Sequence, residues 1–180
     1  MQPTWVLPVL QNELVYSDRE RFFVNEEYLK IYWITKYLKR LLFLKIVDIF
    51  SGAKESQIID CRHQNILWIN WAAPSLGDSL MDLAGRKLLA GKSLSLLTQP
   101  KNKELYDGDI YFTAIFSSIQ EVIKRPDKHP FDLVILDSYS PRVVIQKLKV
   151  APQADYLGLY GFLNGFEVHR TYFSFARLGE

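Results

Sequence analysis

From residue 65 onward the chain alternates short apolar runs with helical segments, and this alternation constrains the fold more than any other feature. The expected strands are 66–69, 93–98, 111–115, 131–136 and 154–159, and the expected helices are 78–90, 117–124 and 141–149. Strands that alternate with helices form a parallel sheet, because each crossover needs a helix to return the chain. The sequence therefore predicts an α/β fold, a Rossmann-like parallel sheet with flanking helices.

A long helix is expected before the sheet. Asn25 can cap it, Glu26 and Glu27 suit the positive end of its dipole, and Ser51-Gly52 supplies a stop. One stripe recurs at intervals of three or four residues, at Ile31, Thr35, Leu38, Leu42, Ile46 and Ile49. With residues 1–24 read as irregular, we interpret 1–60 as a helical N-terminal extension and 61–180 as the Rossmann-like domain.

The basic, aromatic helix around residues 28–50 allows two interpretations. Its aromatic and basic residues interleave, at Trp33, Tyr37 and Phe43 with Lys36, Lys39 and Arg40. They could rest on an anionic membrane surface, or the helix could pack on the domain with its lysines reaching outward. We favour packing, because the basic residues spread around much of the helix. The longest clean apolar run, 41–44, is too short to cross a bilayer.

Composition excludes several classes of function. A net charge of +2 gives no basic field for nucleic acid. Cys61 is the only cysteine, so no internal disulfide or multi-cysteine zinc site can form, and a catalytic role for it is the less favoured reading. The histidines, His63, His129 and His169, lack metal-ligand spacing. For this reason we expect no metal site. No signal peptide is read at the N-terminus, so we expect a cytoplasmic protein.

The loop after the first strand, Pro74 to Asp78, is the first candidate site. Ligands of open parallel sheets bind beyond the carboxyl ends of the strands. Gly77 is expected to permit a tight turn, and Asp78 falls in the first turn of the next helix, where the helix dipole favours an ionised carboxylate. Such a group could accept a proton. On residue type and position alone, a helix cap is the favoured role for Asp78.

The loop after the clearest strand, 137–142, is the second candidate. Ser138, Tyr139 and Arg142 offer two hydroxyls and a guanidinium that could hold a sugar or a phosphate. Capping and surface ion pairing explain the same residues equally well, and the sequence leaves both interpretations open.

Residues 65–175 resemble glycosyltransferase family 9, the lipopolysaccharide heptosyltransferases. The resemblance rests on a first strand followed by Ser75-Leu76-Gly77-Asp78 and a helix, on Thr98 at the end of the second strand, and on the later strand Phe131-Asp132-Leu133-Val134-Ile135. In that family two Rossmann-like domains face each other across a cleft. The N-terminal domain binds the acceptor, and the C-terminal domain binds a nucleotide sugar, typically ADP-heptose.

The resemblance implies an inverting glycosyl transfer that needs no metal or other cofactor. Asp78 would be the base that deprotonates the acceptor hydroxyl, whose oxygen attacks the anomeric carbon in line. Ser75, Gly77, Ser138, Tyr139 and Arg142 are then the expected acceptor-binding residues. The partners would be a lipopolysaccharide-core or other glycan acceptor and a nucleotide sugar. Peripheral contact with the inner face of the cytoplasmic membrane stays open.

The chain departs from the family pattern at several positions. Ala84 stands where the family commonly has proline, and Leu136 where it has the aspartate that closes the later strand, with Asp137 one position on. The 180 residues match only the N-terminal of the two domains. We therefore expect an acceptor-binding half with little turnover alone, because the C-terminal donor-binding domain is missing from this sequence. The alternative is a non-catalytic Rossmann-like module that binds a glycan, a nucleotide or a protein.

Overall fold

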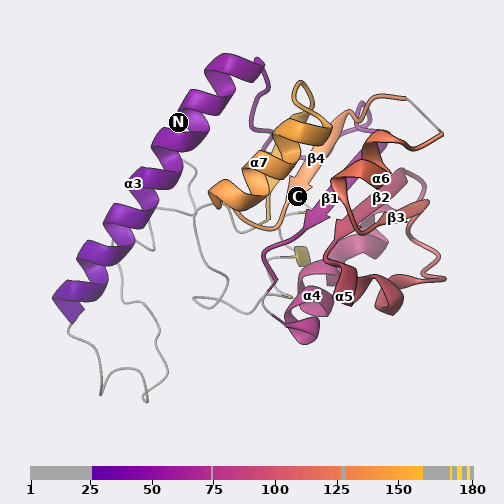
Figure 1. Cartoon of the computed structure of the whole chain (residues 1–180), viewed down its shortest axis with the longest axis horizontal. Coiled ribbons are helices and arrows are strands. Elements are labelled where there is room, and N and C mark those ends of the chain that lie inside the picture. Colours follow the sequence, from indigo (N-terminus) through magenta and orange to yellow (C-terminus); the bar gives the residue numbers. More distant parts are fainter. Residues whose placement is uncertain are drawn as a thin grey trace.

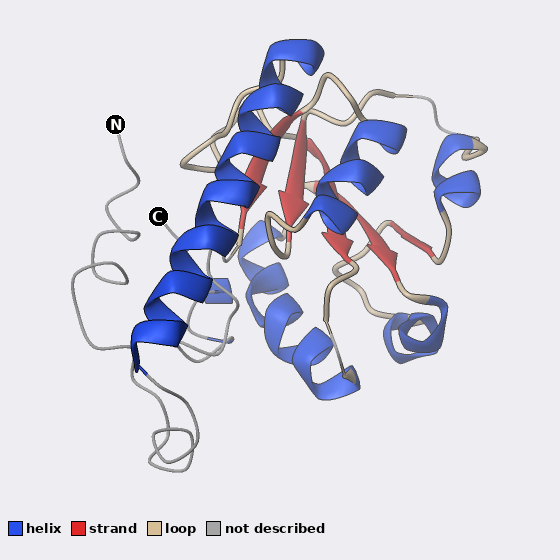
Figure 2. Ribbon diagram, turned by 60° about the vertical axis from the view of Figure 1, so that its left-hand side comes forward, coloured by secondary structure: helices blue, strands red, loops and turns tan. Residues whose placement is uncertain are grey.

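A five-stranded, all-parallel sheet forms the centre of the chain, which confirms the Rossmann-like α/β prediction (Figures 1 and 2). The computed structural model describes residues 26–73, 75–126, 129–159, 171, 174, 175 and 178. The strands are β1 (Asn65–Asn70), β2 (Ser93–Thr98), β3 (Ala114–Phe116), β4 (Leu133–Leu136) and β5 (Asp155–Gly158). Their order in the sheet is β3-β2-β1-β4-β5, so β1 lies in the middle.

The described helices cover both faces of the sheet (Figure 2). They are α3 (Glu26–Ser51), α4 (Leu76–Asp82), η1 (Leu83–Leu89), α5 (Pro100–Lys103), η2 (Glu104–Tyr106), α6 (Ile119–Ile123) and α7 (Pro141–Val150). Alternate residues of each strand point to opposite faces. Leu67 and Ile69 of β1 therefore join one core cluster with α3, α6 and α7, while Ile66 and Trp68 join another with η1 and η2.

The segment expected as one helix over 78–90 is divided into α4 and the 3-10 helix η1. Gly85 lies within η1, where a Cβ would lie 2.3 Å from the backbone oxygen of Ser174. The Gly85 N–H donates to Ser174 Oγ at 2.7 Å. The absence of a side chain at Gly85 allows this close backbone approach.

The third strand begins later than expected, at Ala114 instead of 111. Tight turns occupy the preceding residues, where Asp109 N–H donates to Tyr106 O and Phe112 N–H donates to Asp109 O. The short helices α5 and η2 were not expected, because no apolar period extends over so few residues.

Helix α3 forms as expected, but its predicted stripe faces the wrong way. Arg40, Leu44 and Val47 are buried against the domain, whereas Leu38, Leu42, Ile46 and Ile49 of the predicted stripe are exposed. Thr35 is exposed as well. Apolar residues occur all around this helix, so its period could not identify the inner face. The side chain of Ile31 and the cap at Asn25 lie outside the described residues, as do residues 1–24. In the part of the chain that is described, no helix is long and apolar enough to cross a membrane.

Polar contacts fasten the end of α3 to β5. The Tyr156 hydroxyl donates to both carboxylate oxygens of Asp48, at 2.8 and 3.0 Å. Burial and this contact raise the pKa of Tyr156, and burial raises the pKa of Asp48. Beside them Lys147 is buried and donates from Nζ to Pro152 O at 2.6 Å. Burial lowers the pKa of Lys147 to about 8, against the opposing charges of Asp48 and Asp155.

The chain after α3 covers the outer edge of β5. Tyr156 N–H donates to Lys54 O at 3.0 Å, and Ser56 N–H donates to Tyr156 O at 2.7 Å. An uncovered strand edge invites pairing with other chains. Residues 54–56 therefore protect this edge of the sheet.

Candidate functional site

The candidate site lies at the carboxyl edge of the sheet, where β1 and β4 are neighbours. β1 pairs with β2 on one side and with β4 on the other. The chain moves outward through β2 and β3 in one direction and through β4 and β5 in the other. Ligands of open α/β sheets bind at such a reversal of strand order. The loops that leave β1 and β4 are therefore the two that flank the expected position.

A reciprocal cap fixes the first of these loops. Ser75 is the N-cap of α4, and its Oγ accepts from the Asp78 N–H at 3.1 Å. In return, Asp78 Oδ2 accepts from Ser75 Oγ at 2.6 Å and from Ser75 N–H at 3.2 Å. This is a capping box, the arrangement that satisfies backbone donors at a helix start. It also holds the half-buried Asp78 carboxylate in one orientation beside the carboxyl end of β1.

The backbone conformation at Gly77 does not require a glycine. The described glycines with positive φ are Gly52, Gly91 and Gly108, so Gly77 has a conformation open to any residue. A Cβ on Gly77 would have Ser75 Oγ, at 3.9 Å, as its nearest described neighbour within 4 Å. The prediction of a glycine-dependent turn is therefore wrong. As far as the described residues go, the space beside Gly77 is open, and it lies at the start of α4.

Two side chains from other loops hold the β1 loop in place. Asp137 Oδ2 accepts from the Ala72 N–H at 2.5 Å. Gln99, just after β2, donates from Nε2 to Trp71 O at 2.7 Å and to Ala73 O at 3.3 Å. Sequence reasoning left the role of Asp137 open and did not identify Gln99. Nothing in the local pattern indicates either contact, because each joins segments far apart in the chain.

A buried polar network lies beneath the loop and attaches α4 to the sheet. Ser79 Oγ donates to Asn70 Oδ1 at 2.5 Å and lies 2.6 Å from the Tyr106 hydroxyl. Asn70 Nδ2 donates to Asp82 Oδ2 at 3.1 Å. Burial raises the pKa of Tyr106. Satisfied buried networks rigidify their surroundings, so Asp78 stands on a helix that is fixed by Ser79 and Asp82.

The second predicted loop contributes less than expected. Tyr139 is fully buried, where its hydroxyl donates to Glu55 and accepts from the Gly158 N–H at 3.1 Å. Its role is to join the β4 loop to β5, so the prediction that it contacts an acceptor is not supported by its position. Ser138 is buried as well, with its Oγ 3.2 Å from Ser140 Oγ.

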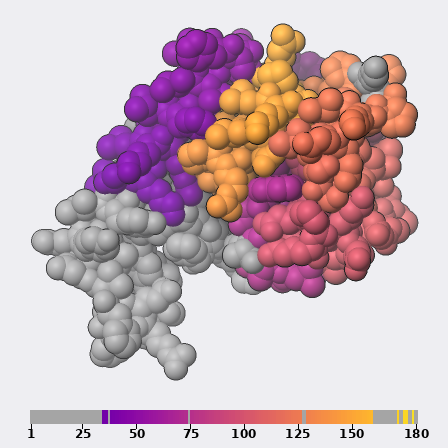
Figure 3. Space-filling model, in the orientation of Figure 1, coloured from indigo at the N-terminus to yellow at the C-terminus, as the bar shows by residue number. Residues whose placement is uncertain are grey.

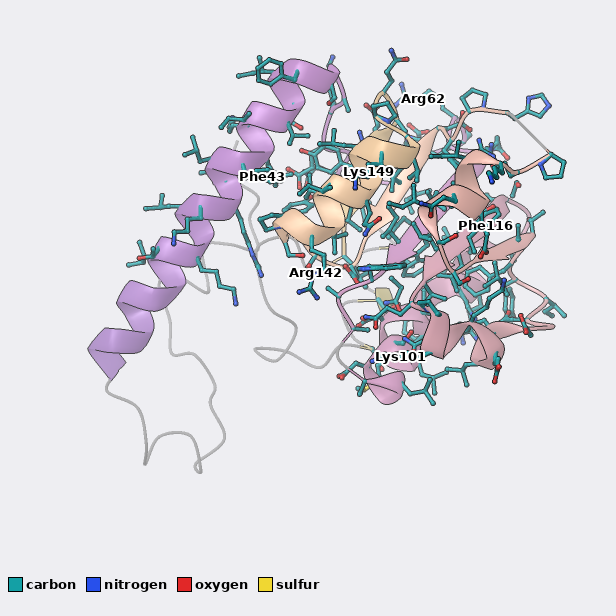
Figure 4. The ribbon with its side chains drawn as sticks, viewed as in Figure 1. Phe43, Arg62, Lys101, Phe116, Arg142 and Lys149 are labelled. Atoms are coloured by element: carbon teal, nitrogen blue, oxygen red, sulfur yellow. The ribbon has the colours of Figure 1, made fainter. Side chains whose placement is uncertain are left out.

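Arg142 has the accessible functional group of this loop. It is exposed at the start of α7 and points away from the helix (Figure 4). Among the described contacts it has no hydrogen bond or ion pair. Its guanidinium is therefore available to an anionic or hydroxyl-rich ligand.

The other reactive residues named from the sequence do not assemble into a second site in the part of the chain that the structure describes, from which His169 is excluded. Cys61 is exposed, and His63 is buried with its Nδ1 accepting from the Asp60 N–H at 3.1 Å. Hydrogen bonds from Arg62 lower the pKa of Asp60 to about 2. Across the described ranges, no group of three or more His, Cys, Asp or Glu side chains could hold a metal ion.

Comparisons with known proteins found no match, so the evidence on function is the geometry of this site. No protein-family model, no curated protein and no solved structure matches the chain.

Proposed function

We propose that this chain is the acceptor-binding domain of an inverting glycosyltransferase, with Asp78 as the base that deprotonates the acceptor hydroxyl. The observation that carries the proposal is the Ser75–Asp78 turn. It presents an oriented, half-buried carboxylate at the point where an open α/β sheet binds its ligands. A base must lie within hydrogen-bond reach of the proton that it removes, so a fixed carboxylate at a sheet edge meets the first requirement.

Three further features support this assignment. The β1 loop is held by Asp137 and Gln99, so its carboxylate needs little reorganisation before it acts. The open space at Gly77 would allow an acceptor to approach the helix start closely. Arg142 adds an exposed guanidinium on the neighbouring loop, which could hold a hydroxyl or a phosphate of the acceptor.

The test supplies the natural gene product with ADP-heptose and a heptose-free lipopolysaccharide core. Release of ADP measures the sugar transfer. Asp78→Asn is expected to lower kcat by about 10²- to 10⁴-fold, with the acceptor KM changed by only a few-fold. Ser75→Ala removes the cap but leaves the carboxylate, so it should retain far more activity. Unchanged turnover in Asp78→Asn would exclude Asp78 as the base.

The 180 residues alone are expected to bind the acceptor with little or no turnover, because the donor would bind a separate domain. Isothermal titration with core oligosaccharides measures the first part and ADP release the second. Rapid turnover by the 180-residue chain would contradict the division of roles between two domains.

A non-catalytic binding module is the second candidate, and the capping box favours it. The mutual hydrogen bonds of Ser75 and Asp78 account for both residues without any reaction. If the natural gene product binds a glycan or nucleotide, and no nucleotide sugar is consumed, this candidate replaces the transferase.

A further inference from the structure

Helix α3 carries an apolar face that no described part of the chain covers. Its members are large apolar residues that recur along one side of the helix, and we call them the outer stripe: Ile34, Leu38, Leu42, Ile46, Ile49 and Phe50. Ile49 and Phe50 remain 80% and 86% exposed. Soluble monomers rarely leave a continuous apolar patch of this kind in water, so such patches indicate binding surfaces.

The opposite side of α3 already has its partner. Leu44 and Val47 belong to the core cluster that includes α7, and Phe43 packs against it (Figure 4). In the space-filling view, α3 forms an edge of the molecule, with the rest of the domain on one side (Figure 3). Packing on the domain therefore explains the inner face of the helix and leaves the outer stripe unexplained.

The charges that border the stripe are positive. Residues three or four apart lie side by side on a helix. Lys39 is therefore next to Leu42, and Lys45 is next to both Leu42 and Ile49. Both lysines are exposed. Asp48 is the only acid between residues 34 and 50, and its carboxylate accepts from Tyr156 on the inner side.

We propose that the outer stripe of α3 binds the surface of a membrane that contains anionic lipids. An apolar helix face with exposed lysines beside it matches a bilayer boundary, where the apolar side chains enter the acyl region and the lysines meet anionic headgroups. A second copy of the chain fits less well. Pairing of two stripes would bring Lys39 and Lys45 of both copies together, and Asp48, which accepts from Tyr156 on the inner side, would not balance them.

The test is flotation of the intact 180-residue chain with phosphatidylcholine vesicles, with and without phosphatidylglycerol. Binding is expected to the mixed vesicles and to be much weaker on phosphatidylcholine alone. Ile49→Glu should reduce the partition coefficient on mixed vesicles by about tenfold or more, since it removes apolar contact and adds a repelled charge. Circular dichroism checks that each variant remains folded.

Ile110→Glu is the matched control. Ile110 is 88% exposed in the loop between η2 and β3, so the change is chemically the same and lies away from α3. It should leave vesicle binding unchanged. Equal losses in Ile49→Glu and Ile110→Glu would overturn the proposal, as would a wild-type chain that does not bind mixed vesicles.

Charge and self-association are tested separately. Lys39→Gln and Lys45→Gln are each expected to weaken binding to mixed vesicles by about fivefold, with little change on phosphatidylcholine. Sedimentation velocity without lipid tests the second copy. A dimer that Ile49→Glu dissociates, with no change in vesicle binding, would assign the stripe to self-association and overturn the membrane proposal.

Discussion

The Asp137 carboxylate accepts the backbone N–H of Ala72 at 2.5 Å and thereby joins the loop after β4 to the loop after β1. These loops leave neighbouring strands at the reversal of strand order. A single buried side chain therefore sets the relative position of the two segments that flank the candidate site. Its contribution can be measured apart from any activity.

Asp137→Asn is expected to lower the free energy of unfolding by about 1–3 kcal/mol, because the half-buried Ala72 N–H loses a charged acceptor. Urea unfolding measures the change. Asp107→Asn is a control for the loss of charge, since Asp107 is exposed, and it should change stability by less than about 0.5 kcal/mol. Equal effects of the two substitutions would show that the bridge contributes nothing specific.

Gly77→Ala is expected to leave thermal stability unchanged or slightly raised, because the added Cβ meets only ordinary contact in a helix. In the proposed function the methyl group would occupy space that the acceptor needs. Affinity for a core oligosaccharide, measured by titration, should therefore fall. Unaltered affinity would remove Gly77 from the acceptor site while leaving the assignment of Asp78 intact.

Ser75→Ala is expected to cost about 1 kcal/mol of folding stability, the usual effect of losing an N-cap. Since Ser75 and Asp78 bond each other, Ser75→Ala and Asp78→Asn should not be additive. Denaturant unfolding of the two single variants and the double variant measures the coupling. Strict additivity would mean that the cap contributes no coupling energy in solution.

Gly158→Ala is expected to destabilise the fold by about 1–3 kcal/mol, because its Cβ would lie 2.3 Å from ring atoms of Tyr139. Thermal or urea unfolding measures the loss, with Gly77→Ala as the matched glycine control. Repeating the change in a Tyr139→Ala background removes the obstructing ring, so the additional cost there should be small. If Gly158→Ala lowers stability just as much in that background, the ring of Tyr139 is not the cause of the loss.

Lys147 predicts a pH dependence of stability with a definite sign. Burial lowers its pKa to about 8 in the folded chain, whereas the pKa of an unfolded lysine is about 10.4. Between these values the unfolded state binds more protons, so the free energy of unfolding rises with pH, by up to about 1.4 kcal/mol per unit.

Wild type and Lys147→Met should therefore diverge between pH 8 and 10, with the wild type gaining stability relative to the variant. Urea unfolding at several pH values measures this difference. The raised pKa of Tyr156 acts above the unfolded tyrosine value of about 10 and the raised pKa of Asp48 acts in acid, so neither masks the effect. A difference that stays constant over this range would contradict the shift at Lys147.

Local patterns in the sequence predicted the sheet well, because apolar runs and the turn residues that bound them can be read from neighbouring positions. The runs that contain Leu67, Leu96 and Val134 are strands as expected. The orientation of α3 was wrong because both sides of that helix are apolar, and only contact with α7 distinguishes Leu44 from Leu42. Such a choice depends on tertiary packing, which no periodicity within the helix contains.

The contact at the centre of the candidate site could be predicted from the sequence, but the contacts that hold the surrounding loops could not. Ser75 and Asp78 lie three residues apart, the spacing of a capping box, so their contact follows from the sequence. The burial of Tyr139 depends on Glu55 and Gly158, one before the sheet and the other in its last strand. Contacts of this kind depend on the topology of the sheet.

The central position of β1 has a consequence for synthesis of the chain. Ile66 pairs with Leu133, 67 residues later. At a translation rate of about 5–20 residues per second, β4 leaves the ribosome about 3–13 s after β1. During those seconds one edge of the central strand has no neighbour, and open strand edges are sites of aggregation. The edge of β1 that pairs with β4 is therefore the part of the sheet that waits longest for its neighbour during synthesis.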